Sequence, residues 1–268
     1  MSITRVLIIA SSDSGGGAGI QADIKAVAAS GGHAATVFAA LTAQNTVGVQ
    51  AVYPLPLDFI RRQFESIADD IGLDAIKTGM LYDASRVKLA AELISYTKVP
   101  VVVDPVMVSK GGDRLLTEEA VTALRDKLLP QASLITPNLD EAEVLLGRRV
   151  RNREEMEQAA RTLSAMGPKA VLIKGGHLTD EPVDVLFDGH AFRHFTAPRI
   201  ETPNTHGTGC SLASGIACFL GQGLPLEAAI SKARSLVRFG ISHSLAIGKG
   251  HGPVHLLARQ SEIFNQRI

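Results

Sequence analysis

The stretch Glu201–Ala217, with the sequence ETPNTHGTGCSLASGIA, joins a turn-rich segment to a helix that we expect to begin near Thr208. The first turn of a helix has unpaired N–H groups and the positive end of the helix dipole, and together these bind anions. Gly207 and Gly209 have no Cβ, so a phosphate group can approach the backbone closely. Cys210 follows in the same field, which tends to lower the pKa of a thiol. The stretch predicts an anion site with a reactive cysteine; the alternative is a loop-to-helix turn with a buried cysteine.

Length and composition limit the classes of protein that this chain can represent. Its 268 residues suffice for one large α/β domain, and we expect a single domain over residues 1–268. Lys plus Arg and Asp plus Glu both total 27, so the formal net charge is zero, and there is no tryptophan to stack on bases. No apolar run approaches the roughly 20 residues of a membrane span. We therefore expect neither nucleic acid nor membrane as a partner.

The cysteines and the N-terminal residues indicate a reduced protein. Cys210 and Cys218 stand eight residues apart on one expected helix, hence about 12 Å apart, which is too far for a disulfide. The apolar stretch Val6–Ala10 is too short for a signal peptide and is typical of a first strand. Both observations predict a cytoplasmic location.

Short β-branched segments alternate with longer helical patterns, which is typical of a mostly parallel sheet flanked by helices. The expected strands are Thr4–Ala10, His33–Ala40, Val49–Tyr53, Ala75–Thr78, Val99–Asp104, Leu134–Thr136, Ala170–Lys174, Val183–Asp188 and Ala191–Ala197. The expected helices are Ala18–Ser30, Leu57–Ile71, a helix capped by Asp83, Thr117–Leu129, Leu139–Leu146, Asn152–Met166, Cys210–Gln222 and Leu226–His243. The last two strands form a predicted hairpin, which we expect to be the one antiparallel part.

Most of the unusual polar and glycine clusters follow directly after these strands. They are Ser11–Gly19, Thr42–Thr46, Gly79–Met80, Asp104–Met107, Asn138–Glu141, Lys174–His177 and Thr205–Cys210. In open α/β sheets, ligands bind beyond the carboxyl ends of the strands. The clusters therefore predict one site along that edge of the sheet.

Two common nucleotide-binding motifs are missing from the chain. Gly15, Gly17 and Gly19 do not have GxGxxG spacing, and no acid closes the second strand, so a Rossmann dinucleotide site is not expected. Gly248–Lys249 is followed by another glycine rather than Ser or Thr, so no Walker A motif is present. Any nucleotide is expected to bind in another way.

Taken together, these segments resemble the ribokinase-like superfamily, and within it the hydroxymethylpyrimidine/phosphomethylpyrimidine kinases of thiamine biosynthesis. The resemblance runs over nearly the whole chain, through the segments Ser12–Asp23, Leu41–Thr46, Val103–Met107, Thr136–Glu141 and Asn204–Cys210. It implies a three-layer fold, ATP and Mg²⁺ as cofactors, and a homodimer. It also implies phosphorylation of a pyrimidine alcohol and then of its monophosphate, both at the expense of ATP.

The resemblance also implies which residues are catalytic. Where sugar kinases of this fold usually have Gly-Ala-Gly-Asp, this chain has Gly207, Thr208, Gly209 and Cys210. Their backbone N–H groups would receive the transferring phosphoryl, as a donor set that is in place before charge develops. Cys210 would be the base for the substrate hydroxyl; the alternative is a thiol that only packs.

Acidic and basic residues at the strand ends are the expected partners of the nucleotide and its metal. The resemblance has Asp104 and Glu141 holding Mg²⁺, largely through water, with Asn138 nearby. Lys174 and Thr208 join Asn138 as expected ATP-binding residues. A solvated acid in the first turn of a helix is the alternative for Glu141, and a solvated lysine is the alternative for Lys174.

Five residues are expected to bind the substrate. The carboxamide of Gln44 matches the donor and acceptor of an aminopyrimidine edge, as Gln and Asn do for adenine; the alternative is an exposed loop glutamine. Asp23 is a second candidate for a polar contact. Gly19 would let backbone approach the flat ring, and Met80 and Val106 would supply apolar contact.

Three other functions remain open at this point. A pyridoxal kinase, or an enzyme that accepts both substrates, acts on a similar flat heterocycle with a hydroxymethyl group. A cysteine hydrolase would use Cys210 with His206 as base, but no third group to orient the base is recognisable, and His206 is expected to be a turn residue. A non-catalytic binder of a vitamin precursor is the third.

Overall fold

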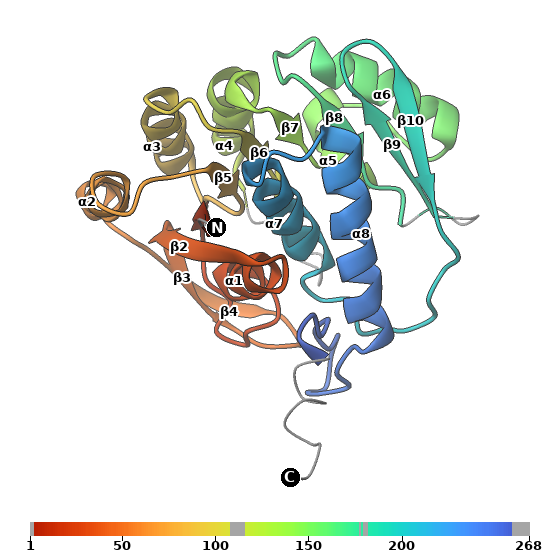
Figure 1. The fold of residues 1–268 in the computed structure, drawn as a ribbon, viewed down its shortest axis with the longest axis horizontal. Helices are drawn as coiled ribbons and strands as arrows, with labels where there is room; N and C mark the ends of the chain where they lie inside the picture. The colour runs from red at the N-terminus through yellow and green to blue at the C-terminus, as the bar shows by residue number, and fades with distance from the viewer. Residues whose placement is uncertain (1–2, 108–115, 177, 179–181, 259–268) are drawn as a thin grey trace.

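The computed structural model describes residues 3–107, 116–176, 178 and 182–258. His177, which belongs to one expected cluster, lies outside these residues. Within the described part, a sheet of eight strands forms the centre of the molecule (Figure 1). In spatial order the strands are β10 (Phe192–Thr196), β9 (Val183–Phe187), β8 (Val171–Ile173), β7 (Leu134–Ile135), β6 (Val101–Val103), β5 (Ala75–Thr78), β1 (Thr4–Ala10) and β2 (Gly32–Phe38).

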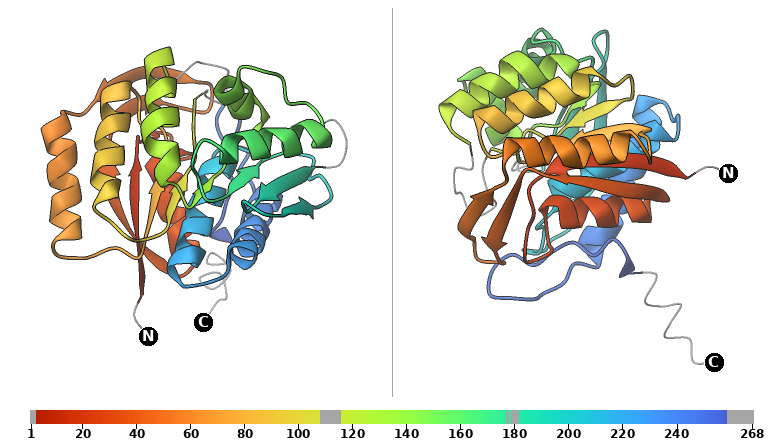
Figure 2. Two further views of the ribbon diagram at one scale, coloured as in Figure 1. Left: turned by 90° about the horizontal axis from the view of Figure 1, so that it is seen from above. Right: turned by 90° about the vertical axis from the view of Figure 1, so that its left-hand side faces the viewer.

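Helices cover both faces of this sheet, giving three layers (Figure 2). They are α1 (Gly19–Ala29), α2 (Leu57–Ala68), α3 (Ala84–Ser95), α4 (Glu118–Ala123), α5 (Leu139–Leu146), α6 (Arg153–Ser164), α7 (Thr208–Gly221) and α8 (Leu226–Ser242). Successive residues of a strand point to opposite faces. In β1, Leu7 and Ile9 accordingly pack in the core under α2 to α6, whereas Val6 and Ile8 pack in the core under α1, α7 and α8.

The pairing of the strands confirms a mostly parallel sheet. From β8 to β2 every neighbouring pair is parallel, and β9 is antiparallel to both β8 and β10. The predicted hairpin is therefore confirmed. The carboxyl ends of the parallel strands meet at one edge, as expected for a single site.

Several helix starts confirm expectations from capping. The side chain of Asp83 accepts a hydrogen bond from the N–H of Arg86, and Thr117 accepts one from Ala120. The helix expected over Thr117–Leu129 is less regular than predicted, because α4 continues as a π-helical turn η1 (Leu124–Leu128) and a 3₁₀ turn η2 (Leu129–Gln131).

The segment after β2 corrects the expectation of one antiparallel part. The chain leaves the main sheet at Ala39 and forms β3 (Ala40–Gln44), which pairs antiparallel with β4 (Val49–Pro54) in a separate two-stranded sheet. The expected strand His33–Ala40 thus ends early, at Phe38. The first residues of the expected cluster Thr42–Thr46 lie in β3. The sequence prediction missed this hairpin because its buried and exposed residues alternate over only five positions. No helix in the described part of the chain is long and apolar enough to cross a membrane.

Candidate active site

A cavity of about 560 Å³ opens at the carboxyl edge of the sheet. All the predicted site residues except Asp23 line it, namely Gly19, Gln44, Met80, Asp104, Val106, Asn138, Glu141, Lys174, Gly207, Thr208, Gly209 and Cys210. They come from the segments that follow β5, β6, β7 and β8, from β3, and from the starts of α1, α5 and α7. The topology therefore brings together residues that the sequence separates by almost 200 positions.

Helix α7 begins without a side-chain cap, which leaves its first amides open. Its N-cap residue Gly207 has φ +82°, and the N–H of Ser211 donates to the carbonyl of Gly207 at 2.9 Å. Among the described residues, no hydrogen-bond acceptor is found for the N–H groups of Gly209 and Cys210. Both residues line the cavity. Open amides at the positive end of a helix form an anion site.

A positive side chain lies beside this helix start. The Lys174 ammonium is 2.9 Å from Asp104 Oδ1 and 3.7 Å from Glu141 Oε2. A Cβ added to Gly209 would come within 3.2 Å of the Lys174 ammonium, so the cation lies directly against the first turn of α7. Burial alone lowers the pKa of Lys174, but the two carboxylates raise it above its ordinary value, so the side chain stays charged. The solvated alternative for this lysine is wrong.

Glu141 is buried rather than solvated. It forms a capping box with Asn138: the carboxylate accepts from the N–H of Asn138 at 2.7 Å, and the side chain of Asn138 accepts from the N–H of Glu141 at 2.8 Å. Burial, together with the nearby charge of Asp104, raises the pKa of Glu141 to about 7, although Lys174 opposes the rise. Burial therefore makes this carboxyl group a weaker acid than an exposed glutamate.

The carboxylates at this edge fit a magnesium ion with few protein ligands. Asp104 Oδ1 accepts from Lys174 and from the hydroxyl of Thr136 at 3.1 Å. Glu141 uses Oε2 in the capping box, so within the described residues Asp104 Oδ2 and Glu141 Oε1 have no hydrogen-bond donor. Magnesium usually keeps several waters and takes one or two carboxylates plus phosphate oxygens. No group of three or more His, Cys, Asp or Glu side chains suited to a metal occurs in the described part of the chain.

Cys210 lies at the predicted place, but its thiol is not acidified. Burial raises its pKa to about 12, and the carboxylates of Asp23 and Asp104 add to the rise while Lys77 opposes it. The expectation of a lowered pKa is therefore wrong, because the cost of removing a thiolate from water outweighs the helix dipole. Both cysteines are free, as predicted.

This pKa predicts how Cys210 reacts with an alkylating agent. In a Cys218→Ala background, we expect the rate of carbamidomethylation of Cys210 by iodoacetamide to rise about tenfold per pH unit from pH 7 to 10, because only the thiolate reacts. The measurement is intact mass against time at each pH. A rate that levels off near pH 8 would contradict a buried neutral thiol.

Asp23 is a correction to the expected substrate contacts. Its carboxylate is fully buried under the cavity, where both oxygens accept from the Lys77 ammonium, at 2.8 and 2.9 Å, and Ser214 donates to it at 2.7 Å. Lys77 is also fully buried, yet it lines the cavity. Sequence reasoning missed Lys77, although a lysine inside the apolar strand β5 before Gly79 was a usable signal.

Four of the five expected substrate residues, Gly19, Gln44, Met80 and Val106, line the cavity. Gln44 is on β3, and its side-chain oxygen accepts from the hydroxyl of Thr42 at 3.3 Å. The carbonyl of Met80 accepts from Ser11 at 2.9 Å, which holds the turn after β5 in place. Gly19 has φ +53°, and a Cβ there would lie 2.6 Å from the carbonyl oxygen of Ser11, so only glycine fits. Gly19, Met80 and Val106 line the same cavity as Gln44.

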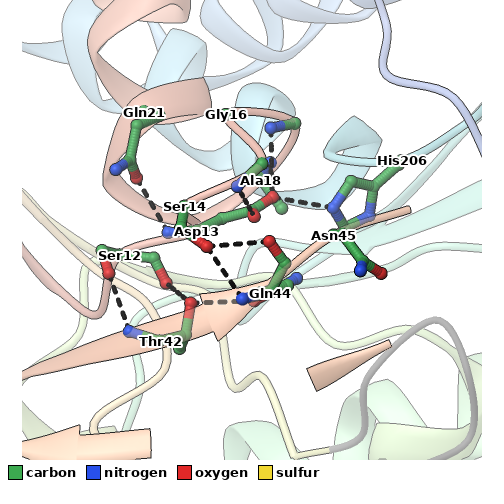
Figure 3. A network of polar contacts seen from close by, with 12 residues as sticks. Ser12, Asp13, Ser14, Gly16, Ala18, Gln21, Thr42, Gln44, Asn45 and His206 are labelled. Carbon is green, nitrogen blue, oxygen red and sulfur yellow. Dashed lines mark hydrogen bonds and ion pairs between the residues drawn. The ribbon is translucent and has the colours of Figure 1, made fainter. Parts of the chain in front are cut away.

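Two further ion pairs line the cavity and were not expected from the sequence. Asp13 Oδ2 is 2.8 Å from Nε2 of His206, which joins the Gly-rich turn after β1 to the segment before α7 (Figure 3). Asp184 Oδ2 is 3.0 Å from Arg234 at the other end of the cavity. No local pattern marks these pairs, because 193 and 50 residues separate the partners.

Comparison with known proteins agrees with this arrangement. The family model of phosphomethylpyrimidine kinase matches residues 13–255. A hydroxymethylpyrimidine/phosphomethylpyrimidine kinase of Streptomyces coelicolor is 48% identical over 249 residues, which cover 93% of both chains. A thiamine biosynthesis bifunctional protein of Geobacter sulfurreducens is 49% identical over 95% of this chain, and the chain spans only 53% of that relative.

Solved structures show the same fold. The ADP complex of a Bacillus subtilis pyridoxal kinase superimposes with a TM-score of 0.90 at 38% identity, covering 97% of this chain and 99% of that one. A phosphomethylpyrimidine kinase of Clostridium difficile superimposes with a TM-score of 0.79, also at 38% identity, over 88% and 98% of the two chains.

The fold and the site together define a small-molecule kinase of the ribokinase-like class. Its sheet edge presents an open helix start, the partly buried Lys174 and two carboxylates to one cavity. Within that class, the chain belongs to the phosphomethylpyrimidine kinase family.

Proposed function

We propose that the protein transfers the terminal phosphoryl group of ATP to 4-amino-5-hydroxymethyl-2-methylpyrimidine, and then a second phosphoryl group to the resulting monophosphate. The observation that carries this proposal is that one cavity is lined both by the open α7 amides with the adjacent Lys174 ammonium and by Gln44. The first set suits a phosphoryl group, and the carboxamide suits an aminopyrimidine edge. The names of the relatives support both phosphorylations.

The residues of this chain account for the needs of phosphoryl transfer, which are alignment and charge neutralisation. The amides of Gly209 and Cys210 receive the oxygens of the transferring group, and Lys174 balances the charge on the leaving ADP. Asp104 and Glu141 would hold Mg²⁺, which when bound would supply charge neutralisation for the phosphates of ATP. In the first reaction the oxygen of the alcohol forms a bond to phosphorus and the bond to ADP breaks. The proton of the alcohol passes to Cys210 in its thiolate form, which is the minor form in the free protein. Asn138 and Thr208 border the phosphate region.

The decisive experiment is product analysis by mass spectrometry after incubation with the pyrimidine alcohol, ATP and Mg²⁺. The proposal expects the monophosphate first and the diphosphate later, each with one equivalent of ADP. Binding of the alcohol without ADP formation would instead favour a binding protein. Ester hydrolysis that is lost on alkylation and unaffected by ATP would favour a hydrolase, although His206 faces Asp13 here rather than a thiolate.

Gly207→Ala tests the anion site at the start of α7. A Cβ at this position would overlap the carbonyl oxygen of Gly17, and the left-handed backbone costs a non-glycine residue about 1–2 kcal/mol. We expect the free energy of unfolding to fall by about 2 kcal/mol and kcat to fall about tenfold, because the amides shift. Urea denaturation and ADP release measure the two effects.

Gly223→Ala is the matched control for this variant. Gly223 also has φ +82°, but a Cβ there meets no atom within 4 Å. We expect a similar backbone cost of about 1 kcal/mol and an unchanged kcat. Equal values of kcat in the two variants would contradict a role of Gly207 in the anion site.

Pyridoxal is a second candidate substrate, favoured by the similarity to pyridoxal kinases of known structure. Parallel kinetics with both alcohols decide between a selective enzyme and one that accepts both. We expect the pyrimidine to have the larger kcat/KM, because Gln44 matches the aminopyrimidine edge. A larger kcat/KM for pyridoxal would instead identify pyridoxal as the preferred substrate.

We further propose a single-domain, cytoplasmic enzyme that forms a homodimer. The family resemblance supports the dimer, and the β3–β4 hairpin offers an apolar outer face. Its paired residues Leu41 and Tyr53 are 43% and 66% exposed. Sedimentation equilibrium tests the association, and a monomer at micromolar concentration would exclude the dimer.

A further inference from the structure

The carboxylate of Asp13 is the centre of a hydrogen-bond network that joins three segments of the chain (Figure 3). Its Oδ1 accepts from the N–H of Gly15 at 2.8 Å. Its Oδ2 accepts from the N–H groups of Gly17 and Ala18 at 3.0 and 2.7 Å, and Nε2 of His206 lies 2.8 Å away. Burial alone would raise the pKa of Asp13, but the hydrogen bonds from His206 and Ala18 lower it, so the group is an ionised acceptor.

His206 is itself held at a fixed place in the backbone. Its N–H donates to the carbonyl of Gly252 at 3.1 Å, and its carbonyl accepts from the N–H of Val254 at 3.1 Å. The imidazole lies against Gly17 so closely that a Cβ on Gly17 would overlap the ring. The next residue, Gly207, is the N-cap of α7. A shift of His206 therefore moves the start of the helix that carries the anion site.

Hydrogen bonds also join the Gly-rich turn after β1 to strand β3. The hydroxyl of Ser14 donates to the carbonyl of Gln44 at 2.7 Å, and the N–H of Gln44 donates back to that hydroxyl at 2.8 Å. The hydroxyl of Thr42 donates to the carbonyl of Ser12 at 2.9 Å. The turn thus touches both the residue expected to select the substrate and the segment that precedes α7.

We propose that Asp13 and His206 are positioning residues that set the separation between the substrate bound at Gln44 and the phosphoryl group bound at the start of α7. This inference rests on the proposed phosphoryl transfer and adds to it a pair that acts through other residues. Loss of the pair loosens the contact between the turn and Gly207 without removing either binding surface.

The environment of Asp13 argues against direct contact with substrate. A carboxylate offers about four acceptor sites, and four donors already surround this one. The side chain is only 2% exposed. Asp13 therefore has no free lone pair for a ligand, although it lines the cavity. We therefore expect Asp13 to act by fixing the positions of neighbouring residues. Such an effect can be large, because misplacement of reacting groups by about 1 Å can cost up to 100-fold in rate.

The test compares Asp13→Asn and His206→Leu with His206→Gln, in which the carboxamide nitrogen takes the place of Nε2. We expect the first two variants to lower kcat for the pyrimidine alcohol about 10- to 50-fold. The Kd of the alcohol and the Kd of a non-hydrolysable ATP analogue are each expected to change less than about threefold. His206→Gln is expected to keep kcat within about threefold of the wild type. If Asp13→Asn does not fold, the two His206 variants decide the question.

Asp188→Asn is the matched control, because Asp188 also accepts two backbone N–H groups in a tight turn but lies in the β9–β10 hairpin, away from the cavity. We expect its kcat to equal that of the wild type. Values of kcat within threefold of the wild type for both Asp13→Asn and His206→Leu would overturn the inference. So would weaker ligand binding with kcat unchanged.

Amide hydrogen exchange separates this inference from the proposed function, since it requires no catalysis. We expect exchange at Gly15, Gly17 and Ala18 to accelerate at least tenfold in Asp13→Asn. Unchanged exchange would overturn the role of Asp13 whatever the catalytic result. A wild-type protein that forms no phosphorylated product would overturn the proposed function instead.

Discussion

Cys210→Ala is expected to slow phosphorylation of the pyrimidine alcohol about 100- to 1000-fold and phosphorylation of its monophosphate less than about tenfold. A positioned general base contributes typically 100- to 10,000-fold when the nucleophile must lose a proton. The alcohol must do so, whereas the phosphate acceptor is already an anion. Because burial raises the pKa of Cys210 to about 12, the thiolate is rare in the free protein. The alanine variant therefore measures how far the thiol contributes once the reactants are bound.

Single-turnover kinetics with each purified acceptor measure the two steps separately. Cys218→Ala is the matched control, since Cys218 lies on the same helix but packs against α1, with its sulfur 3.9 Å from the carbonyl of Val27. We expect this control to leave both rates unchanged. Equal losses of the two rates in Cys210→Ala would refute a base and leave the residue a structural part of the anion site.

Asp23→Asn is expected to lower the free energy of unfolding by about 3–5 kcal/mol, because it leaves the ammonium of Lys77 buried without its counter-charge. Both side chains are 0% exposed, and the pair is joined by two hydrogen bonds. Burial alone lowers the pKa of Lys77, but Asp23 and the neighbouring acidic groups raise it above its ordinary value. The lysine thus enters the folded state charged and depends on its partner. Urea denaturation followed by circular dichroism gives the change, provided that the slope with urea concentration is constant.

An exposed pair supplies the control for this prediction. Arg61 and Glu92 are 2.8 Å apart, like the buried pair, but their side chains are 36% and 46% exposed. We expect Glu92→Gln to cost less than about 1 kcal/mol, because water screens the charges. The double variant Asp23→Leu/Lys77→Met is expected to regain much of the stability lost in Asp23→Asn, since no charge remains buried. A loss in the free energy of unfolding below about 1 kcal/mol in Asp23→Asn would show that the pair of Asp23 and Lys77 does not stabilise the fold.

Local chemistry made much of the fold and the site predictable. Apolar spacing located the helices, the β-branched segments located most strands of the sheet, and Asp83 and Thr117 marked helix starts through their capping side chains. Glycines next to a helix start indicated the anion site, because the open amides and the helix dipole belong to a few consecutive residues. The family resemblance then supplied roles for residues at the strand ends, and all but Asp23 line one cavity.

Only the tertiary structure decided which charges are buried and what they face. The contact of Asp23 with Lys77 spans 54 residues and that of Asp13 with His206 spans 193, so neither leaves a periodic trace in the sequence. The pKa of Cys210 was mispredicted for the same reason: the helix dipole is local, but desolvation sums over every segment packed around the thiol. The sequence by itself determined the elements and the chemistry offered at the sheet edge. Packing between distant segments determined the protonation and the spacing of those groups.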